Sequence, residues 1–172
     1  MITKYNLKWM DLDIESGAEN DTTSITRRNQ ALKNLQAANP GLKVSYTLGV
    51  NPTGLPQAQL NLLSNAKSNG VNVAIVNVMA MDYGTCNIDM GQAAISAASG
   101  TRTQLSNIGL PAQVGVTPMI GVNDTTCENF TTANAQALVN YANANSYIGL
   151  LAYWAVGADP GNNYLNIFKT FH

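Results

Sequence analysis

The sequence predicts an α/β fold in which parallel strands alternate with helices. Apolar strand-like segments and amphipathic helical segments follow one another strictly along the 172 residues, as in β-α-β units with right-handed crossovers. Residues 71–81 form a nearly continuous apolar run between Gly70 and Gly84, which is typical of a strand covered on both faces in a parallel sheet. A chain of this length is expected to fold as a single domain over residues 1–172.

Five segments are expected to be strands, because each is rich in apolar or β-branched residues and is bounded by polar, Gly or Pro-containing stretches. The first alternates apolar with acidic residues, and the third is the continuous apolar run. In chain order, the expected strands are 7–15, 43–50, 71–81, 112–122 and 148–156.

A helical segment follows each strand, with apolar residues spaced three or four positions apart. Pro40-Gly41 ends the first helix, Gly70 ends the second, and Thr131 or Thr132 caps the fourth. In chain order, the expected helices are 23–39, 56–70, 90–108, a fourth around 135–142, and 164–171.

Two architectures fit this alternation, an open doubly wound sheet and part of a barrel. No glycine-rich phosphate loop follows any expected strand, because Gly115 and Gly121 are not at GxGxxG spacing and a GxxxxGK motif is absent. A nucleotide-binding sheet is therefore disfavoured.

Composition excludes several classes of partner. The net charge is −1, only 11% of residues are charged, and the one basic cluster is Arg27-Arg28, so neither nucleic acid nor an anionic membrane is expected to bind. No apolar run reaches membrane-spanning length, and residues 1–6 lack the apolar core of a signal peptide.

Two cysteines, Cys86 and Cys127, each follow an expected strand in a polar loop, so both should emerge at the same end of the fold. This favours a loop-to-loop disulfide, formed in an oxidising compartment, over two free thiols. Because His172 is the only histidine, the inventory excludes both a tetrahedral zinc site and a His-based triad, and we expect no metal.

The first strand carries the residues with the clearest chemistry. Asp11, Asp13 and Glu15 alternate with apolar residues, so an extended backbone places all three carboxyls on one face, about 6–7 Å apart. Mutual repulsion favours a proton shared among them, which is the usual condition of a general acid. The alternative is an exposed antiparallel edge strand with no catalytic role.

The segment Asp11-Leu12-Asp13-Ile14-Glu15 resembles the DxDxE core of the family 18 glycoside hydrolases, the chitinases. In that family the motif ends the fourth strand of a TIM barrel, and its Glu is the catalytic acid. The fuller family pattern is DGxDxDxE, and this sequence has Lys8 and Trp9 in place of the first Asp and the Gly.

Later strands carry further family motifs. The segment 79–83, Met-Ala-Met-Asp-Tyr, resembles the sixth-strand motif Met-x-Tyr-Asp that lines the cleft beside the cleaved sugar. Asp82 matches the family Asp. The family's Tyr, which holds the acetamido group of the substrate, falls on Met81, and Tyr83 is the adjacent phenol that could replace it.

Three more segments extend the resemblance. Residues 45–48 with the turn 51–55 resemble the fifth strand, residues 117–124 the seventh, and Tyr153-Trp154-Ala155 followed by Asp159 the eighth, whose Trp forms the floor under the sugar. Taken alone, Trp154 would be interpreted as a core residue. Besides Asp82, Tyr83 and Met81, the expected substrate-binding residues are Trp154, Tyr46, Met79 and Met119, the two methionines as core or cleft wall.

The resemblance implies the (β/α)5 portion of a TIM (β/α)8 barrel, lacking the first three β/α units, and a secreted enzyme that hydrolyses chitin or chito-oligosaccharides without a cofactor. Glu15 would be the acid, Asp13 would orient the acetamido group, and Asp11 would set the charge of Asp13. With two open sheet edges, we expect the chain to pair with an N-terminal barrel segment or to self-associate, and to be weakly active or inactive alone. The alternatives are a silent chitin-binding protein and an inert fragment.

Overall fold

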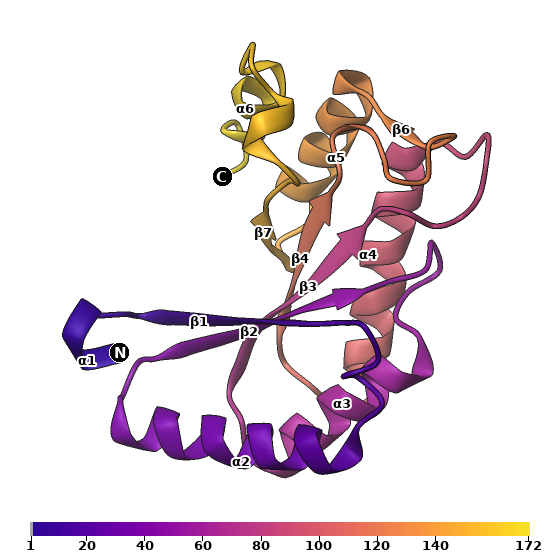
Figure 1. Ribbon diagram of the computed structural model, residues 1–172. Helices are drawn as coiled ribbons and strands as arrows, with labels where there is room; N and C mark the ends of the chain where they lie inside the picture. The colour runs from indigo at the N-terminus through magenta and orange to yellow at the C-terminus, as the bar shows by residue number, and fades with distance from the viewer. Residues whose placement is uncertain (1) are drawn as a thin grey trace.

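The computed structural model describes residues 2–172, and it confirms the α/β fold of parallel strands alternating with helices (Figure 1). The five-stranded sheet has the order β1-β2-β3-β4-β7, and every neighbouring pair is parallel. Its strands are β1 (Trp9–Ile14), β2 (Lys43–Gly49), β3 (Val73–Ala80), β4 (Gln113–Pro118) and β7 (Ile148–Leu151). Consecutive strands therefore lie side by side, as short β-α-β crossovers require.

The helices are α1 (Ile2–Tyr5), α2 (Thr22–Ala38), α3 (Gln57–Ser68), α4 (Met90–Asn107), α5 (Thr132–Asn143) and α6 (Asn163–Phe168). Side chains of Asp21, Asp89 and Thr131 cap α2, α4 and α5 by accepting from a backbone N–H three residues on. Within residues 2–172, no helix is both long enough and apolar enough to cross a bilayer.

The expected strand 112–122 is wrong at its C-terminal end. β4 stops at Pro118, and Gly121 then takes a positive φ of 73° that turns the chain into a two-residue antiparallel ribbon, β5 (Gly121–Val122) with β6 (Asn129–Phe130). The expected strand 148–156 is also shorter, because β7 ends at Leu151 and a 3-10 turn (Val156–Ala158) follows. Helix α1 had no counterpart among the sequence predictions.

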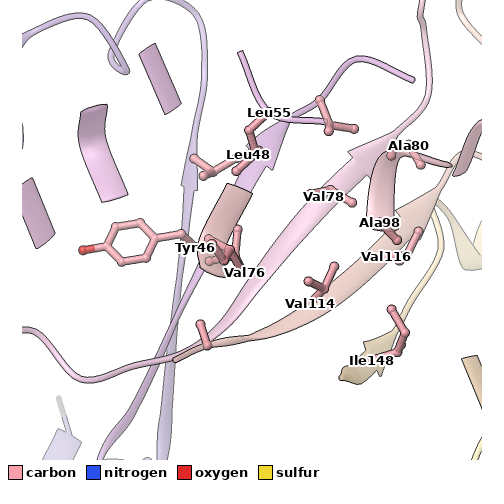
Figure 2. Packing of buried hydrophobic residues seen from close by; sticks show 14 of the residues in the cluster. Tyr46, Leu48, Leu55, Val76, Val78, Ala80, Ala98, Val114, Val116 and Ile148 are labelled. Carbon is pink, nitrogen blue, oxygen red and sulfur yellow. The ribbon is translucent and has the colours of Figure 1, made fainter. Parts of the chain in front are cut away.

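One face of the sheet packs against the helices. Figure 2 shows the apolar side chains that β2, β3, β4 and β7 contribute to this layer, together with Ala98 of α4. The fully buried strand residues are Val44, Tyr46, Leu48, Val76, Val78, Ala80, Val114 and Val116. The opposite face carries polar side chains from the alternate positions, so the fold leaves that face for chemistry.

A close backbone approach locks α4 onto the loop after β2. Gly100 lies against Thr53 and Gly54, and an added Cβ would collide with the carbonyl oxygen of Thr53. Nothing at this position can give way except the backbone, because the neighbouring atoms are main-chain atoms.

We expect Gly100→Ala to lower the free energy of unfolding by about 1–3 kcal/mol through overpacking, partly offset by the roughly 1 kcal/mol better helix propensity of Ala. Urea unfolding followed by circular dichroism would measure this change. Gly157→Ala is the matched control, since no atom lies within 4 Å of the Cβ it would add. Equal stability of the two variants would contradict the close packing of α4.

Candidate active site

Strand β1 places its carboxylates on the polar face of the sheet. Asp11 pairs with Ser45 and Asp13 with Thr47 in a parallel register, whereas Ile14 is buried on the helix side. Glu15 follows the last residue of the strand and is exposed. β1 is an edge strand, but its pairing is parallel, so the alternative of an antiparallel edge is wrong.

The three carboxylates differ in their partners. Both oxygens of Asp11 accept hydrogen bonds, from the hydroxyl of Ser45 and, at 2.7 Å, from the hydroxyl of Thr47. Within residues 2–172, neither the Asp13 nor the Glu15 carboxylate has a hydrogen-bond partner in the protein. The two groups nearest the strand end are therefore free to meet a ligand.

Glu15 lies on the wall of two open pockets. One, of about 360 Å³, is also lined by Met79, Met81 and Asp82 from the end of β3. The other, of about 510 Å³, runs along the outer edge of β1 and is lined by Asp11, Asp13 and Arg28. The two pockets thus bring five further predicted site residues to Glu15, and each of the five has side-chain oxygen or sulfur atoms: Asp11, Asp13, Met79, Met81 and Asp82.

Asp82 is held by the loop that follows β4. Its φ is 50°, its Oδ1 accepts from the backbone N–H of Thr125 at 2.6 Å, and its own N–H donates to the side chain of Asn123. The expected disulfide is confirmed, since Cys86 and Cys127 join the same two loops with a Cα–Cα distance of 5.2 Å. Asp82 is therefore oriented by a loop about 40 residues away in sequence.

Glu128 is the residue of this region that the sequence did not reveal. It is only 1% exposed, and its carboxylate accepts from the backbone N–H groups of Tyr83 and Thr85 at 3.0 and 3.1 Å. A buried carboxylate needs such donors, and here they fix the loop that carries Asp82. The only available signal was its position next to Cys127.

Tyr83 does not present its hydroxyl to a ligand. The hydroxyl oxygen is buried with no hydrogen-bond partner in residues 2–172, and its ring packs against the hydrophobic core. Burial, and secondly the negative charge of Glu128, raise the pKa of Tyr83 well above its ordinary value. The expectation that Tyr83 replaces the family Tyr at the acetamido group therefore does not fit this conformation.

Tyr46 is also misplaced by the sequence prediction. It is fully buried among the core residues of the helix face (Figure 2). Its hydroxyl donates to Asn29 of α2 at 2.5 Å. Tyr46 follows Ser45 by one position, and successive strand residues point to opposite faces. Its role is packing, and it lines no part of the pockets around Glu15.

Trp154 stands at the far side of the sheet from Glu15. Its side chain is 63% exposed, and its backbone bonds to Pro118 and Ile120, with a cis peptide linking it to Ala155. Four strand spacings separate the two residues, about 19 Å along the sheet. Met119 pairs with Trp154 in an isolated bridge and is nearly buried, so it acts as wall rather than as a contact group.

We expect Glu128→Gln to lower the free energy of unfolding by about 1.5–3 kcal/mol, because the amide can accept from one N–H donor but turns its own donor toward the other. Asp124→Asn, an exposed residue of the same loop, is the matched control and should leave stability unchanged. Chemical unfolding of both variants with the disulfide intact tests this. Unaltered stability of Glu128→Gln would show that the buried carboxylate does not hold the loop.

Comparisons with known proteins agree on one kind of enzyme, although no protein-family model matches the sequence. The chain is 36% identical to the "Probable bifunctional chitinase/lysozyme" of Escherichia coli (strain K12), with 100% of this chain and 21% of that protein aligned. It is 35% identical to "Endochitinase 11" of Metarhizium anisopliae, with 92% of this chain and 34% of that protein aligned.

Solved structures extend the similarity to the fold. The catalytic domain of a hyperthermophilic chitinase from Pyrococcus furiosus superposes with a TM-score of 0.86 at 31% identity, over 99% of this chain and 62% of that chain. Catalytic-site mutants of a chitinase domain from the same organism, complexed with chito-oligosaccharides, match equally well at 30% identity. The chain spans 21% and 34% of the length of the two curated relatives and under two thirds of these domains.

Proposed function

We propose that this chain, which has the chitinase-type fold, is a family 18 glycoside hydrolase segment that hydrolyses β-1,4-linked N-acetylglucosamine polymers. As a domain, we propose residues 1–172 to be a partial catalytic barrel without the first three β/α units. The position of Glu15 supports this most directly. It ends the alternating acidic strand and shares a pocket with Asp82 at the carboxyl edge of the sheet, where barrel enzymes build their active sites.

The proposed reaction is substrate-assisted and retains configuration at C1. Glu15 donates its proton to the glycosidic oxygen while the carbonyl oxygen of the substrate's 2-acetamido group attacks C1, so that the C1–O bond breaks as the new ring closes. Water then opens the oxazolinium ion, and Glu15 recovers a proton from that water. The nucleophile belongs to the substrate, so the reaction needs one acid from the protein, and Glu15 at the end of β1 supplies it.

Neighbouring residues would bind the substrate and stabilise the intermediate. Asp13 would orient the acetamido group and stabilise the oxazolinium charge, and Asp11 would set the charge of Asp13. Asp82, rather than the enclosed Tyr83, would face the acetamido group from β3. The exposed indole of Trp154 would stack against the apolar face of a sugar ring.

In the full catalytic unit, we expect Glu15→Gln to reduce the release of reducing ends from N-acetylglucosamine oligomers by at least about 100-fold, because the general acid is lost while its shape is kept. Oligomer binding, measured by calorimetry, should be nearly unchanged. Asp124→Asn is again the control for loss of a carboxylate. Retention of most of the rate in Glu15→Gln would exclude it as the acid.

The same measurements separate the other candidate functions. Binding without turnover, also when the open side of β1 is covered by a complementary segment, would favour a silent chitin-binding protein. Neither binding nor turnover would favour an inert fragment. Since Cys86 and Cys127 are bonded, we also propose an oxidising, extracellular location.

The two outer strands support a proposal about assembly. β1 and β7 each have one unpaired backbone edge, and the edge of β1 borders an open pocket. We propose that a complementary N-terminal segment covers this side, or that the chain self-associates there, and that hydrolysis by the chain alone is weak or absent.

We expect sedimentation of the purified chain to give a mass above the 18.3 kDa of one copy, rising with concentration. A chitinase assay on the same sample should show little turnover. The control is a run in low denaturant, which should dissociate the assembly before the fold is lost. A soluble, fully active species of one chain would contradict the proposal.

A further inference from the structure

We propose that Trp9 and Thr117 are positioning residues for the acidic strand, acting through a one-way hydrogen-bond relay that ends on Asp11. The relay comprises Trp9, Ser45, Thr47, Asn77 and Thr117, from strands β1 to β4. The proposal rests on the function proposed above and deepens it, since Asp11 is the first carboxylate of the acidic strand in that site. The direction of the hydrogen bonds along the relay follows from the groups that can donate but cannot accept.

The short arm begins at Trp9. An indole N–H is a donor and never an acceptor, and that of Trp9 lies 2.7 Å from the hydroxyl oxygen of Ser45. Ser45 has a single proton and is 1% exposed, so this proton goes to the nearest acceptor, Oδ1 of Asp11. Lys43 lies 5.0 Å from the Trp9 ring centroid and holds the ring from the other side.

The long arm begins at Thr117 and crosses β3. Its hydroxyl donates to Oδ1 of Asn77 at 2.9 Å, which turns the amide nitrogen of Asn77 toward Thr47 at 3.1 Å. The hydroxyl of Thr47 accepts from that amide and donates its own proton to Oδ2 of Asp11 at 2.7 Å. Asn77 and Thr47 are both buried, so water does not compete for these bonds.

The two arms meet on one carboxylate and occupy both of its oxygens. Each oxygen of Asp11 thus accepts from a buried hydroxyl, which fixes the orientation of this carboxylate on the polar face of the sheet. Asp13 and Glu15 have no such partners within residues 2–172, so Asp11 is the carboxylate of the acidic strand that the relay holds in place. Trp9 stands where the family pattern has Gly, and its N–H thus directs the Ser45 hydroxyl to donate its proton to Asp11.

The first test uses hydroxyl protons observed by NMR, which needs no turnover. Buried hydroxyls bonded to a carboxylate exchange slowly and resonate downfield, and Ser45→Ala and Thr47→Val assign the two signals by removing them. We expect Trp9→Phe, which keeps the ring for Lys43, to shift the Ser45 signal and leave that of Thr47 in place. Thr117→Val should do the reverse. If both signals are unaffected by these variants, there is no relay.

The second test is kinetic and uses the same proteins with a chito-oligosaccharide. Loss of either arm should lower kcat about five- to tenfold with KM unchanged, as removal of one charge-assisted hydrogen bond would. Thr117→Ser, which keeps the hydroxyl, should restore the rate, and Thr103→Val on the exposed face of α4 should not change it. Unchanged kcat in both Trp9→Phe and Thr117→Val would overturn the positioning role. If the chain alone has no turnover, as the proposal on assembly expects, the NMR test decides the relay by itself, and the proposed function fails only if the chain also does not bind chito-oligosaccharides.

Discussion

The parallel register of β1 on β2 is the constraint from which the site follows. It sets Asp11 against Ser45 and Asp13 against Thr47, so that the acidic face of one strand meets the hydroxyl face of the next. Without those donors, a row of carboxylates on a sheet would repel and remain unsatisfied. The same alternation sends Tyr46 and Leu48 to the helix side, where they complete the core. The same strand register therefore places apolar side chains in the core and the carboxylates on the opposite face.

A second constraint acts at the carboxyl edge of the sheet, where loops rather than strands carry the residues. Asp82 has a left-handed backbone and points where the loop 121–128 directs it, through Thr125, Asn123, Glu128 and the Cys86–Cys127 bond. Glu128 contributes as a buried anion that collects two backbone donors. This explains how an exposed loop residue can keep a defined position beside Glu15.

The two faces of the sheet are held together in different ways. Gly100 allows α4 to touch the turn after β2, and the aliphatic row from β2 to β7 is covered by helices (Figure 2). On the polar face, hydrogen bonds between side chains connect neighbouring strands, and Ser45, Thr47 and Asn77 are buried within that face. The polar face of the sheet therefore forms one wall, with Glu15 and Trp154 at its opposite ends.

The sequence by itself determined the strand and helix order, the acidic strand and the cysteine pair, because periodicity, Gly and Pro punctuation and local motifs are encoded within a few residues. It could not decide that Tyr46 packs against Asn29, that the Tyr83 hydroxyl is enclosed, or that Glu128 holds the loop of Asp82. Asn77 is a polar residue inside an apolar run, which indicates a hydrogen-bonded position in the sheet, but its partners do not follow from the sequence. These contacts join residues that lie 17 to 45 positions apart in the sequence. Only the tertiary structure decided them, because the packing of whole helices and strands determines which face is buried and which donor meets which acceptor.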